Sequence, residues 1–299
     1  ETCASIIDTT EHRMHQVKLY TDAYQQKSTA SGPRHPGAHD ELMRLFDKGM
    51  LSMQYAGHAG YLGLTSEAVF TVSDIAELTN YDRLPFILTA TCEFSQFDDP
   101  SFASAGELMF TLPTGGSVAM LTTVRPTIGN NNINIAKALM HRMYTPDGDK
   151  VSRFGDIVKD TKADNSNFST TNSLSKNISY VFFGDPALRF AAPVEKVVTV
   201  KMNGEELDHE IALHAMSMVN VEGEIRKADG SLDAAFNGEV ELRFFDKESV
   251  FTTLGSSPVM DPVRNFTFFN DVLFQGKATV KQGKFSFSFQ VPRDINLQE

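Results

Sequence analysis

Short apolar segments alternate with amphipathic segments from residue 1 to about residue 192. The apolar segments that predict strands are 16–20, 50–57, 84–91, 116–124 and 178–186. The segments with helical spacing are 37–49, 71–80, 104–113 and 133–144, and we expect Ser73 to cap the second of these helices. Apolar strands that are joined through helices are typical of a parallel sheet covered on both faces. The pattern therefore predicts an α/β domain over residues 1–192.

After Pro193 the pattern changes to short runs in which polar and apolar residues alternate. NG, DG and QG pairs separate these runs, as they do in chains of antiparallel hairpins. The clearest run is "KFSFSFQV", which places Phe285, Phe287, Phe289 and Val291 on one face, where we expect a hydrophobic core. We therefore predict an all-β second domain over residues 193–299, an immunoglobulin-like β-sandwich.

Composition narrows the classes of function. The net charge of −11 argues against nucleic acid as a partner, because binding to phosphates requires clustered Lys and Arg. No apolar run approaches the roughly 20 residues that a membrane-spanning helix needs. The chain has only two cysteines, too few for a disulfide framework, and neither lies in a CxxC metal pattern.

Two chemically versatile residues follow two of the predicted strands. His58 comes after the strand 50–57, and Cys92 comes after the strand 84–91. They lie 34 positions apart, which is about one βαβ unit, so both are expected at the carboxyl edge of the sheet. A thiol needs a neighbouring base to become a thiolate at neutral pH, and histidine is the usual partner. Taken singly, such a cysteine is more often a small buried hydrophobe and such a histidine a loop residue. Together they predict a Cys–His dyad.

Longer stretches around these residues resemble a known family. "YAGHAG", "LPFILTATCEFSQFDDP" and "SAGELM" resemble the gingipain-type cysteine peptidases, which have a caspase-like fold. "VKLYTDAY", "FGDPALRF" and "GKATVKQGKFSFSFQVPRDI" are similar to the sortases of that family, which serve the type IX secretion system of Bacteroidetes. The resemblance covers nearly the whole chain, with both domains in order.

The resemblance implies a cysteine peptidase and transpeptidase at the cell surface, associated with the outer membrane. Its expected partners are the C-terminal domains of secreted cargo, other surface components of the secretion system, and anionic lipopolysaccharide as the acceptor. Such an enzyme removes the C-terminal sorting domain and transfers the new carboxyl terminus to an amine on the acceptor. Two alternatives stay open: a gingipain-type hydrolytic endopeptidase, and a catalytically silent scaffold of the secretion complex.

The resemblance also assigns roles to individual residues. Cys92 matches the nucleophile and His58 the family's histidine, while backbone N–H groups of Cys92 and of residue 59 or 60 would form the oxyanion hole. Ala59 stands where the family usually has glycine, which would cost about 1 kcal/mol if φ were positive there. The resemblance further implies that the catalytic domain is truncated at its N-terminus and lacks the family's opening strand. The candidates for the acid that orients the histidine are Asp8, Glu11 and Glu67.

Three further residues invite a ligand interpretation. Arg125 follows the strand 116–124 at the same expected edge, where it is a candidate substrate-binding residue or a solvated strand-end arginine. Asp98 and Asp99 could contribute to a Ca²⁺ site, but a DDP sequence is more often a turn. We expect no cofactor.

Overall fold

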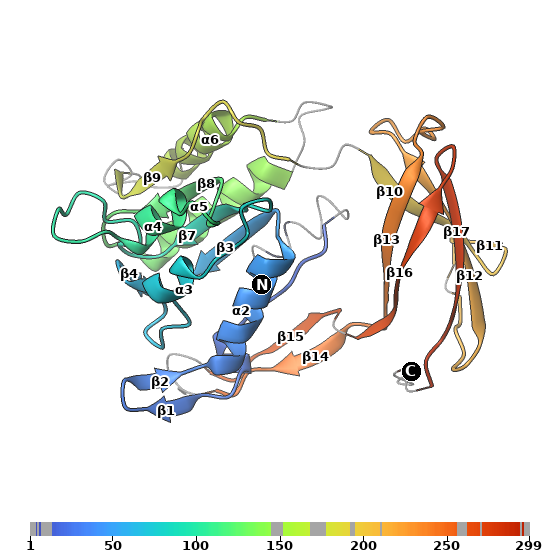
Figure 1. Cartoon of the computed structure of the whole chain (residues 1–299), viewed down its shortest axis with the longest axis horizontal. Helices are drawn as coiled ribbons and strands as arrows, with labels where there is room; N and C mark the ends of the chain where they lie inside the picture. The colour runs from blue at the N-terminus through green and yellow to red at the C-terminus, as the bar shows by residue number, and fades with distance from the viewer. Residues whose placement is uncertain are drawn as a thin grey trace. The chain divides into compact units, whose positions relative to one another are not determined.

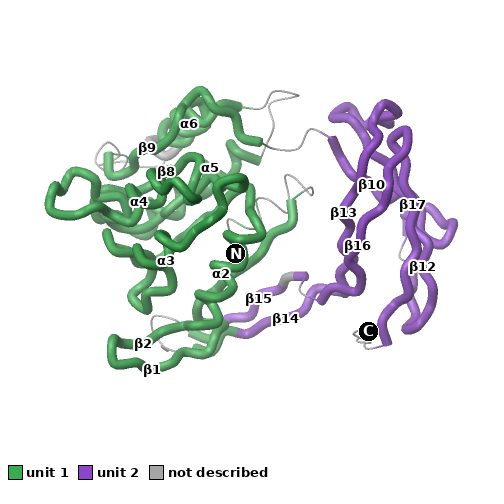
Figure 2. Tube along the Cα trace, viewed as in Figure 1, with its two compact units in different colours: residues 1–192, 253–263 green, residues 193–252, 264–299 purple. Residues whose placement is uncertain are grey.

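The structure is a computed structural model that describes residues 4, 6, 14–144, 152–167, 178–191, 195–209, 211–255, 262–269, 271–293 and 295. The chain forms two compact units (Figure 2). One contains residues 1–192 together with 253–263, and the other contains residues 193–252 and 264–299. The membership of residues 253–263 in the first unit is not evident from the sequence pattern, which places the boundary at residue 193.

A four-stranded sheet lies at the centre of the first unit (Figure 1). Its order is β3 (Ser52–Ala56), β7 (Phe86–Ala90), β8 (Ala119–Thr123) and β9 (Tyr180–Phe183). The pairs β3–β7 and β7–β8 are parallel. Every residue of β7 and β8 is buried, which explains why these strands lack polar alternation in the sequence.

Helices cover both faces of this sheet. They are α2 (Pro36–Lys48), α3 (Val72–Ala76), α4 (Ala105–Thr111), α5 (Gly129–Tyr144) and α6 (Phe154–Asn167). One core cluster packs α5 and α6 against the sheet through Ile135, Leu139 and Ile157. A second cluster, on the opposite face, contains Phe46 of α2, Ile75 of α3 and Met109 of α4. The two clusters confirm the predicted sheet with two covered faces.

Strand β9 departs from the predicted parallel sheet, because it pairs with β8 in the antiparallel direction. The reason is α6, a helix that the sequence analysis did not predict. A single crossover helix brings the chain back to the amino end of the preceding strand, so the next strand runs parallel to it. The two helices α5 and α6 instead bring the chain back to the carboxyl end of β8, so β9 runs antiparallel to β8. Arg142 of α5 and Asp164 of α6 form an ion pair of 2.8 Å between the two helices.

Two local predictions are wrong. Residues 16–20 form no strand and instead precede a short 3₁₀ helix, η1 (Thr21–Ala23), while Leu19 packs against the core from outside the sheet. The cap of α3 is Thr71 rather than Ser73, because Asp74 accepts a hydrogen bond of 2.7 Å from the Thr71 backbone N–H in a capping box. The remaining short strands of this unit are β1 (Lys27–Thr29), β2 (Gly32–Arg34), β4 (Ala59–Gly60), β5 (Gly63–Leu64) and β6 (Phe70–Thr71).

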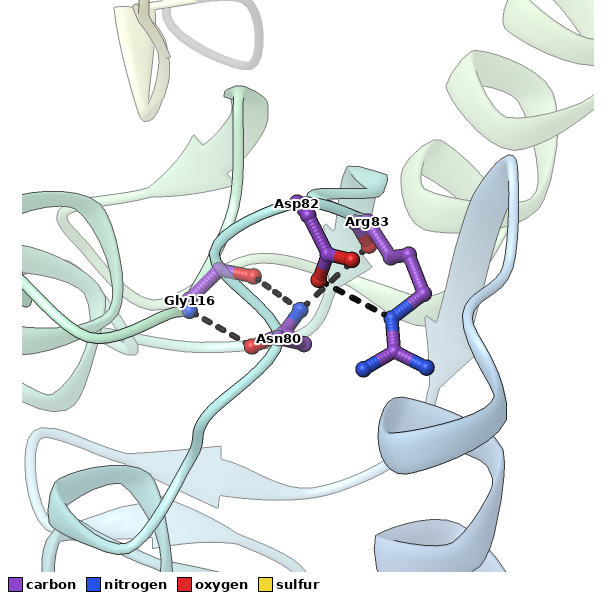
Figure 3. Close-up of polar contacts among 4 residues, drawn as sticks. All are labelled: Asn80, Asp82, Arg83 and Gly116. Carbon is purple, nitrogen blue, oxygen red and sulfur yellow. Dashed lines mark hydrogen bonds and ion pairs between the residues drawn. The ribbon is translucent and has the colours of Figure 1, made fainter.

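A buried amide ties the loop after α3 to the turn before β8 (Figure 3). Asn80 is 1% exposed, and its side chain donates to the Gly116 carbonyl at 3.1 Å and accepts from the Gly116 N–H at 2.9 Å. It also donates to the Arg83 carbonyl at 3.5 Å. Because Asn carries both donors and an acceptor, one side chain satisfies backbone groups from two loops.

The segment 253–263 attaches to the first unit at Asp22 in η1. The Leu254 N–H donates to the Asp22 carbonyl and the Gly255 N–H donates to the Asp22 carboxylate, each at 2.8 Å. This segment lies between the strands β14 (Ser249–Thr252) and β15 (Asn265–Phe268), which pair with each other.

The second unit is a β-sandwich, and the residues described after position 195 contain no helix. One sheet has the order β11 (Glu205–Glu206), β10 (Lys196–Met202), β12 (Met218–Arg226) and β17 (Lys284–Gln290). The other pairs β13 (Gly238–Phe245) with β16 (Val272–Val280). The core contains side chains from both sheets, including the predicted Phe285, Phe289 and Val291, while Phe287 is partly buried against the same core. This confirms the predicted face of β17.

Candidate active site

The register of β3 and β7 places His58 and Cys92 at one edge of the sheet. Ala56 at the end of β3 pairs with Ala90 at the end of β7 in the parallel ladder. His58 lies two positions after Ala56, and Cys92 lies two positions after Ala90. Adjacent strands lie about 5 Å apart. The structure therefore brings both loops to the carboxyl edge, where open α/β sheets bind their ligands.

The chain turns sharply at Cys92. Thr91 before it is fully buried, Cys92 is partly exposed, and Phe94 and Ser95 are buried again at 1% and 0% exposure. Between them, Glu93 has a φ of 51°, in the left-handed region. A residue with a side chain pays roughly 1 kcal/mol or more for this conformation. The strained turn leaves Cys92 partly exposed while the residues on either side of the turn stay in the core.

Buried hydroxyl groups hold the turn in place. The Ser95 N–H donates to the Thr123 carbonyl at 2.9 Å, and the Ser95 hydroxyl lies 2.7 Å from the Thr122 hydroxyl. The Thr122 hydroxyl lies 2.7 Å from that of Thr89. This chain of hydroxyl groups joins the loop after Cys92 to both central strands, β7 and β8.

Helix α4 packs closely against the same turn. The Gly106 N–H donates to the Phe94 carbonyl at 2.9 Å. A Cβ atom on Gly106 would lie 1.7 Å from Ser95 Oγ and 2.6 Å from Ser95 Cβ. Only glycine fits at this position without displacing the turn.

His58 is exposed, and hydrogen bonds to its backbone carbonyl hold its loop in place. Its carbonyl accepts from the Tyr55 hydroxyl at 2.5 Å and from the Thr65 N–H at 2.8 Å. Burial raises the pKa of Tyr55, so this hydroxyl stays a donor at neutral pH. Ala59 begins the short strand β4 and is not among the residues with positive φ, so the predicted strain of alanine at this position is absent.

The thiol has its polar partners in the loop between β8 and α5. The Thr127 N–H lies 3.4 Å from Cys92 Sγ, and the thiol lies 3.7 Å from the Thr127 carbonyl. In the part of the chain that the structure describes, no hydrogen bond joins His58 to Cys92.

The candidates for an orienting acid have different outcomes. Asp8 and Glu11 lie outside the described residues. The charge of Glu67 contributes, after burial, to the raised pKa of Tyr55, but no described hydrogen bond links Glu67 to the His58 imidazole. Its proposed role stays a prediction.

Arg125 leaves β8 at the same edge and pairs with Asp98. One guanidinium nitrogen donates to Asp98 Oδ1 at 2.8 Å and the other contacts Oδ2, so the pair is bidentate. Arg125 holds the pKa of Asp98 below its usual value. Asp99 accepts from the Ser101 N–H at 3.0 Å, as in a turn. Among the described residues, no group of three or more His, Cys, Asp and Glu could hold a metal ion. Substrate binding by Arg125 and the expectations on Ca²⁺ and cofactors stay predictions.

Sequence reasoning missed the residues that surround the thiol. Thr127 lies 35 positions beyond Cys92 in an irregular loop, and no motif marks it. Asn132 and Tyr180 are also close, since the Tyr180 hydroxyl donates to Asn132 at 2.8 Å and Asn132 donates to the Ala90 carbonyl at 3.2 Å. The only available clue was the polar run at the start of α5, "GNNN", which is unusual for a helix that covers a sheet.

Comparisons with known proteins place this arrangement in a family. Among solved structures, the complex of the pro- and mature domains of RgpB from Porphyromonas gingivalis matches with a TM-score of 0.52 at 16% identity, covering 98% of this chain and 56% of that one. The Arg-specific cysteine proteinase gingipain R (RgpB) matches with a TM-score of 0.46 at 16% identity, covering 98% and 66%. The chain thus spans little more than half of the RgpB complex chain.

Dimeric latent PorU from Porphyromonas gingivalis also matches, with 25% identity and a TM-score of 0.35, over 62% of this chain and 17% of that one. No curated protein sequence matches the chain. Among the described helices, none is both long and apolar enough to cross a membrane. The likeness to the RgpB complex supports a gingipain-like fold, as predicted. The sequence model of Peptidase family C25 matches residues 1–191, well over half of the chain. The chain therefore belongs to peptidase family C25.

Proposed function

We propose that this chain carries the catalytic dyad of a cysteine peptidase, with Cys92 as the nucleophile and His58 as its acid–base partner. Membership of family C25 supports the class of enzyme. The observation that carries the assignment is the in-register pairing of Ala56 with Ala90, since it delivers both loops to one edge. The alternative of a silent scaffold gains no support from Ala59, because this residue does not have a positive φ.

The reaction proceeds in two steps. The Cys92 thiolate attacks the scissile carbonyl carbon and forms a C–S bond, while the charge on oxygen is stabilised by the backbone N–H groups of Cys92 and Ala59. Each such donor contributes about 3 kcal/mol. The C–N bond then breaks, and the His58 imidazolium gives its proton to the leaving amine, which leaves a thioester on Cys92.

The fate of the thioester defines the finer function. We propose aminolysis: an acceptor amine attacks the thioester, His58 takes its proton, and an amide bond forms as the thiolate leaves. The support is the sequence resemblance to type IX secretion sortases, which covers both domains. On this proposal the substrate is secreted cargo with its C-terminal domain, the acceptor is anionic lipopolysaccharide, and the site of action is the cell surface at the outer membrane. Water as the acceptor gives the alternative, a hydrolytic endopeptidase.

A single assay separates these outcomes. The chain is incubated with glycinamide and a synthetic peptide that spans the junction between a cargo protein and its C-terminal domain. Mass spectrometry identifies the products. An amide product that disappears in Cys92→Ala and His58→Ala supports the transpeptidase. His141→Ala, which changes an exposed histidine on α5, serves as the matched control. Acid product alone at high glycinamide indicates an endopeptidase, and no cleavage by the wild type indicates a scaffold.

A further inference from the structure

Three hydrogen bonds join Thr127 to the end of the nucleophile strand. The Thr127 hydroxyl donates to the Thr91 carbonyl at 2.7 Å. The Thr127 N–H points to Cys92 Sγ at 3.4 Å, and the thiol points to the Thr127 carbonyl at 3.7 Å. One residue therefore contacts both the peptide before the nucleophile and the sulfur atom itself.

The two contacts with sulfur suit different protonation states. A neutral thiol is a weak donor, and the Thr127 carbonyl is the acceptor in reach. A thiolate only accepts, and the Thr127 N–H is the donor in reach. A hydrogen bond to a charged acceptor is roughly twice as strong as a neutral one. The loop can therefore hold the sulfur before and after it loses its proton.

The loop that carries Thr127 is itself well supported. Val124, just after β8, donates from its N–H to the Ser179 carbonyl at 2.8 Å. Ile128 immediately precedes α5, and its carbonyl accepts from the N–H groups of Asn131 and Asn132 in the first turn at 2.9 and 3.1 Å. Thr127 thus lies between a buried strand and a helix of four turns, which fixes where its N–H points.

A second set of contacts holds Ala90, the residue before Thr91, at the end of β7. Asn132 donates to the Ala90 carbonyl, and Tyr180 fixes the Asn132 amide. Tyr180 is fully buried, and its burial, followed by the charge of Cys92, raises its pKa, so the hydroxyl remains a donor. Carbonyl groups of two successive residues, 90 and 91, therefore have partners on the β8–α5 side.

We propose that Thr127 is a positioning residue of the peptidase, whose hydroxyl anchors the loop so that its backbone N–H holds the Cys92 sulfur in the attacking position. This inference rests on the proposed function for its catalytic meaning. Its physical content, the control of thiol reactivity by Thr127, is independent of any substrate.

The experiment measures alkylation of Cys92 by iodoacetamide at fixed pH, in a Cys3→Ser background that leaves one thiol. Thr127→Val removes the hydroxyl and keeps the size, so loss of the anchoring bond should release the N–H from sulfur. The second-order rate constant should then fall about tenfold, which corresponds to one hydrogen bond of about 1.4 kcal/mol. Thr127→Ser keeps the hydroxyl and should retain the rate of the background protein. The ultraviolet absorbance of the thiolate at the same pH should fall in Thr127→Val and not in Thr127→Ser.

Thr114→Val provides the matched control. Its hydroxyl donates to the Leu78 carbonyl at 2.9 Å, so the variant removes the same kind of bond at a site that does not touch Cys92. Its alkylation rate should equal that of the background protein. Melting temperatures of all variants establish that each one is folded.

The outcomes distinguish this inference from the proposed function. Equal or faster alkylation in a folded Thr127→Val overturns the inference, even if the background protein cleaves peptides. The background protein could also fail to cleave peptides while its alkylation rate falls in Thr127→Val and recovers in Thr127→Ser. That result would refute the proposed peptidase function and support the role of Thr127. Where cleavage occurs, Thr127→Val should lower kcat about tenfold and leave KM within twofold, because the sulfur acts in the bond-forming step and not in binding.

Discussion

Replacing Gly106 by alanine tests whether the turn after Cys92 is as rigid as its contacts indicate. The new Cβ would lie 1.7 Å from Ser95 Oγ and 2.6 Å from Ser95 Cβ. Ser95 has little freedom to yield, because its N–H is bound to Thr123 and its hydroxyl to Thr122. Either α4 or the turn must therefore move.

The cost follows from the bonds that the movement disrupts. The three bonds at risk are Ser95 N–H to Thr123, Ser95 hydroxyl to Thr122, and Gly106 N–H to Phe94, each contributing about 1 kcal/mol. Alanine regains about 1 kcal/mol over glycine in a helix. The net loss in the free energy of unfolding is about 2 kcal/mol, which is within the range found for overpacked cores. For a unit of this size, it lowers the melting temperature by about 4–8 °C.

The control is Gly129→Ala at the start of α5. A Cβ there meets no atom within 4 Å, and its φ is not positive, so the substitution should be neutral or raise stability by up to about 1 kcal/mol. Thermal unfolding of the wild type and both variants is followed by circular dichroism. Iodoacetamide labelling is measured in parallel, and Gly106→Ala should change the rate at Cys92 whereas Gly129→Ala should not.

For a unit of this size, each kcal/mol shifts the melting temperature by about 2–4 °C. A melting temperature of Gly106→Ala within 1 °C of that of Gly129→Ala would therefore contradict this prediction. That result would mean that the contact between α4 and the turn relaxes without cost. A destabilised Gly106→Ala that labels at the wild-type rate would refute only the link from this contact to the thiol.

Three further predictions concern other parts of the first unit. Asn80→Asp should lower the free energy of unfolding by about 3 kcal/mol, because a buried carboxylate cannot donate to the Gly116 carbonyl; urea unfolding measures this, and a loss below 1 kcal/mol would contradict it. Glu93→Gly should be more stable than Glu93→Ala by about 1 kcal/mol in the same assay, because only glycine adopts a φ of 51° without strain, and equal values would show that the turn relaxes. Arg125→Gln should lower the melting temperature above pH about 4, where Asp98 is ionised and pairs with Arg125, and should have no effect in acid. The reason is that the stabilisation from the ion pair is lost as pH falls through the lowered pKa of Asp98. A difference in melting temperature that persists in acid would exclude the ion pair as its source.

The central strands of the sheet were predictable because strands that are buried on both faces consist of nearly continuous apolar residues. Residues 84–91 and 116–124 became β7 and β8, and the loops after β3 and β7 placed His58 and Cys92 at one edge as expected. The direction of β9 was not predictable from its own residues. It depends on α6, whose apolar positions at Phe154, Ile157 and Val158 are followed by a polar tail that weakens the helical pattern.

The surroundings of the thiol were less predictable, for a different reason. Thr127 acts partly through its backbone N–H, a group that every residue except proline carries, so no residue type marks it. Glu93 adopts a backbone conformation that its own side chain disfavours, and only tertiary contacts at Phe94 and Ser95 impose it. Gly106 is an ordinary helix position by its sequence, and its closeness to Ser95 arises only from the packing of α4 against the turn.

The course of the chain between the two units has a consequence for how the protein can be divided. The chain passes from one unit to the other three times, near residues 192, 252 and 263. A stop codon after residue 192 would therefore also delete 253–263, and Asp22 would lose the amides of Leu254 and Gly255. Recombination at a single point cannot exchange the sandwich for another module without removing residues 253–263 from the first unit. The two units therefore alternate along the chain, and two breaks are needed to remove the sandwich without loss from the first unit.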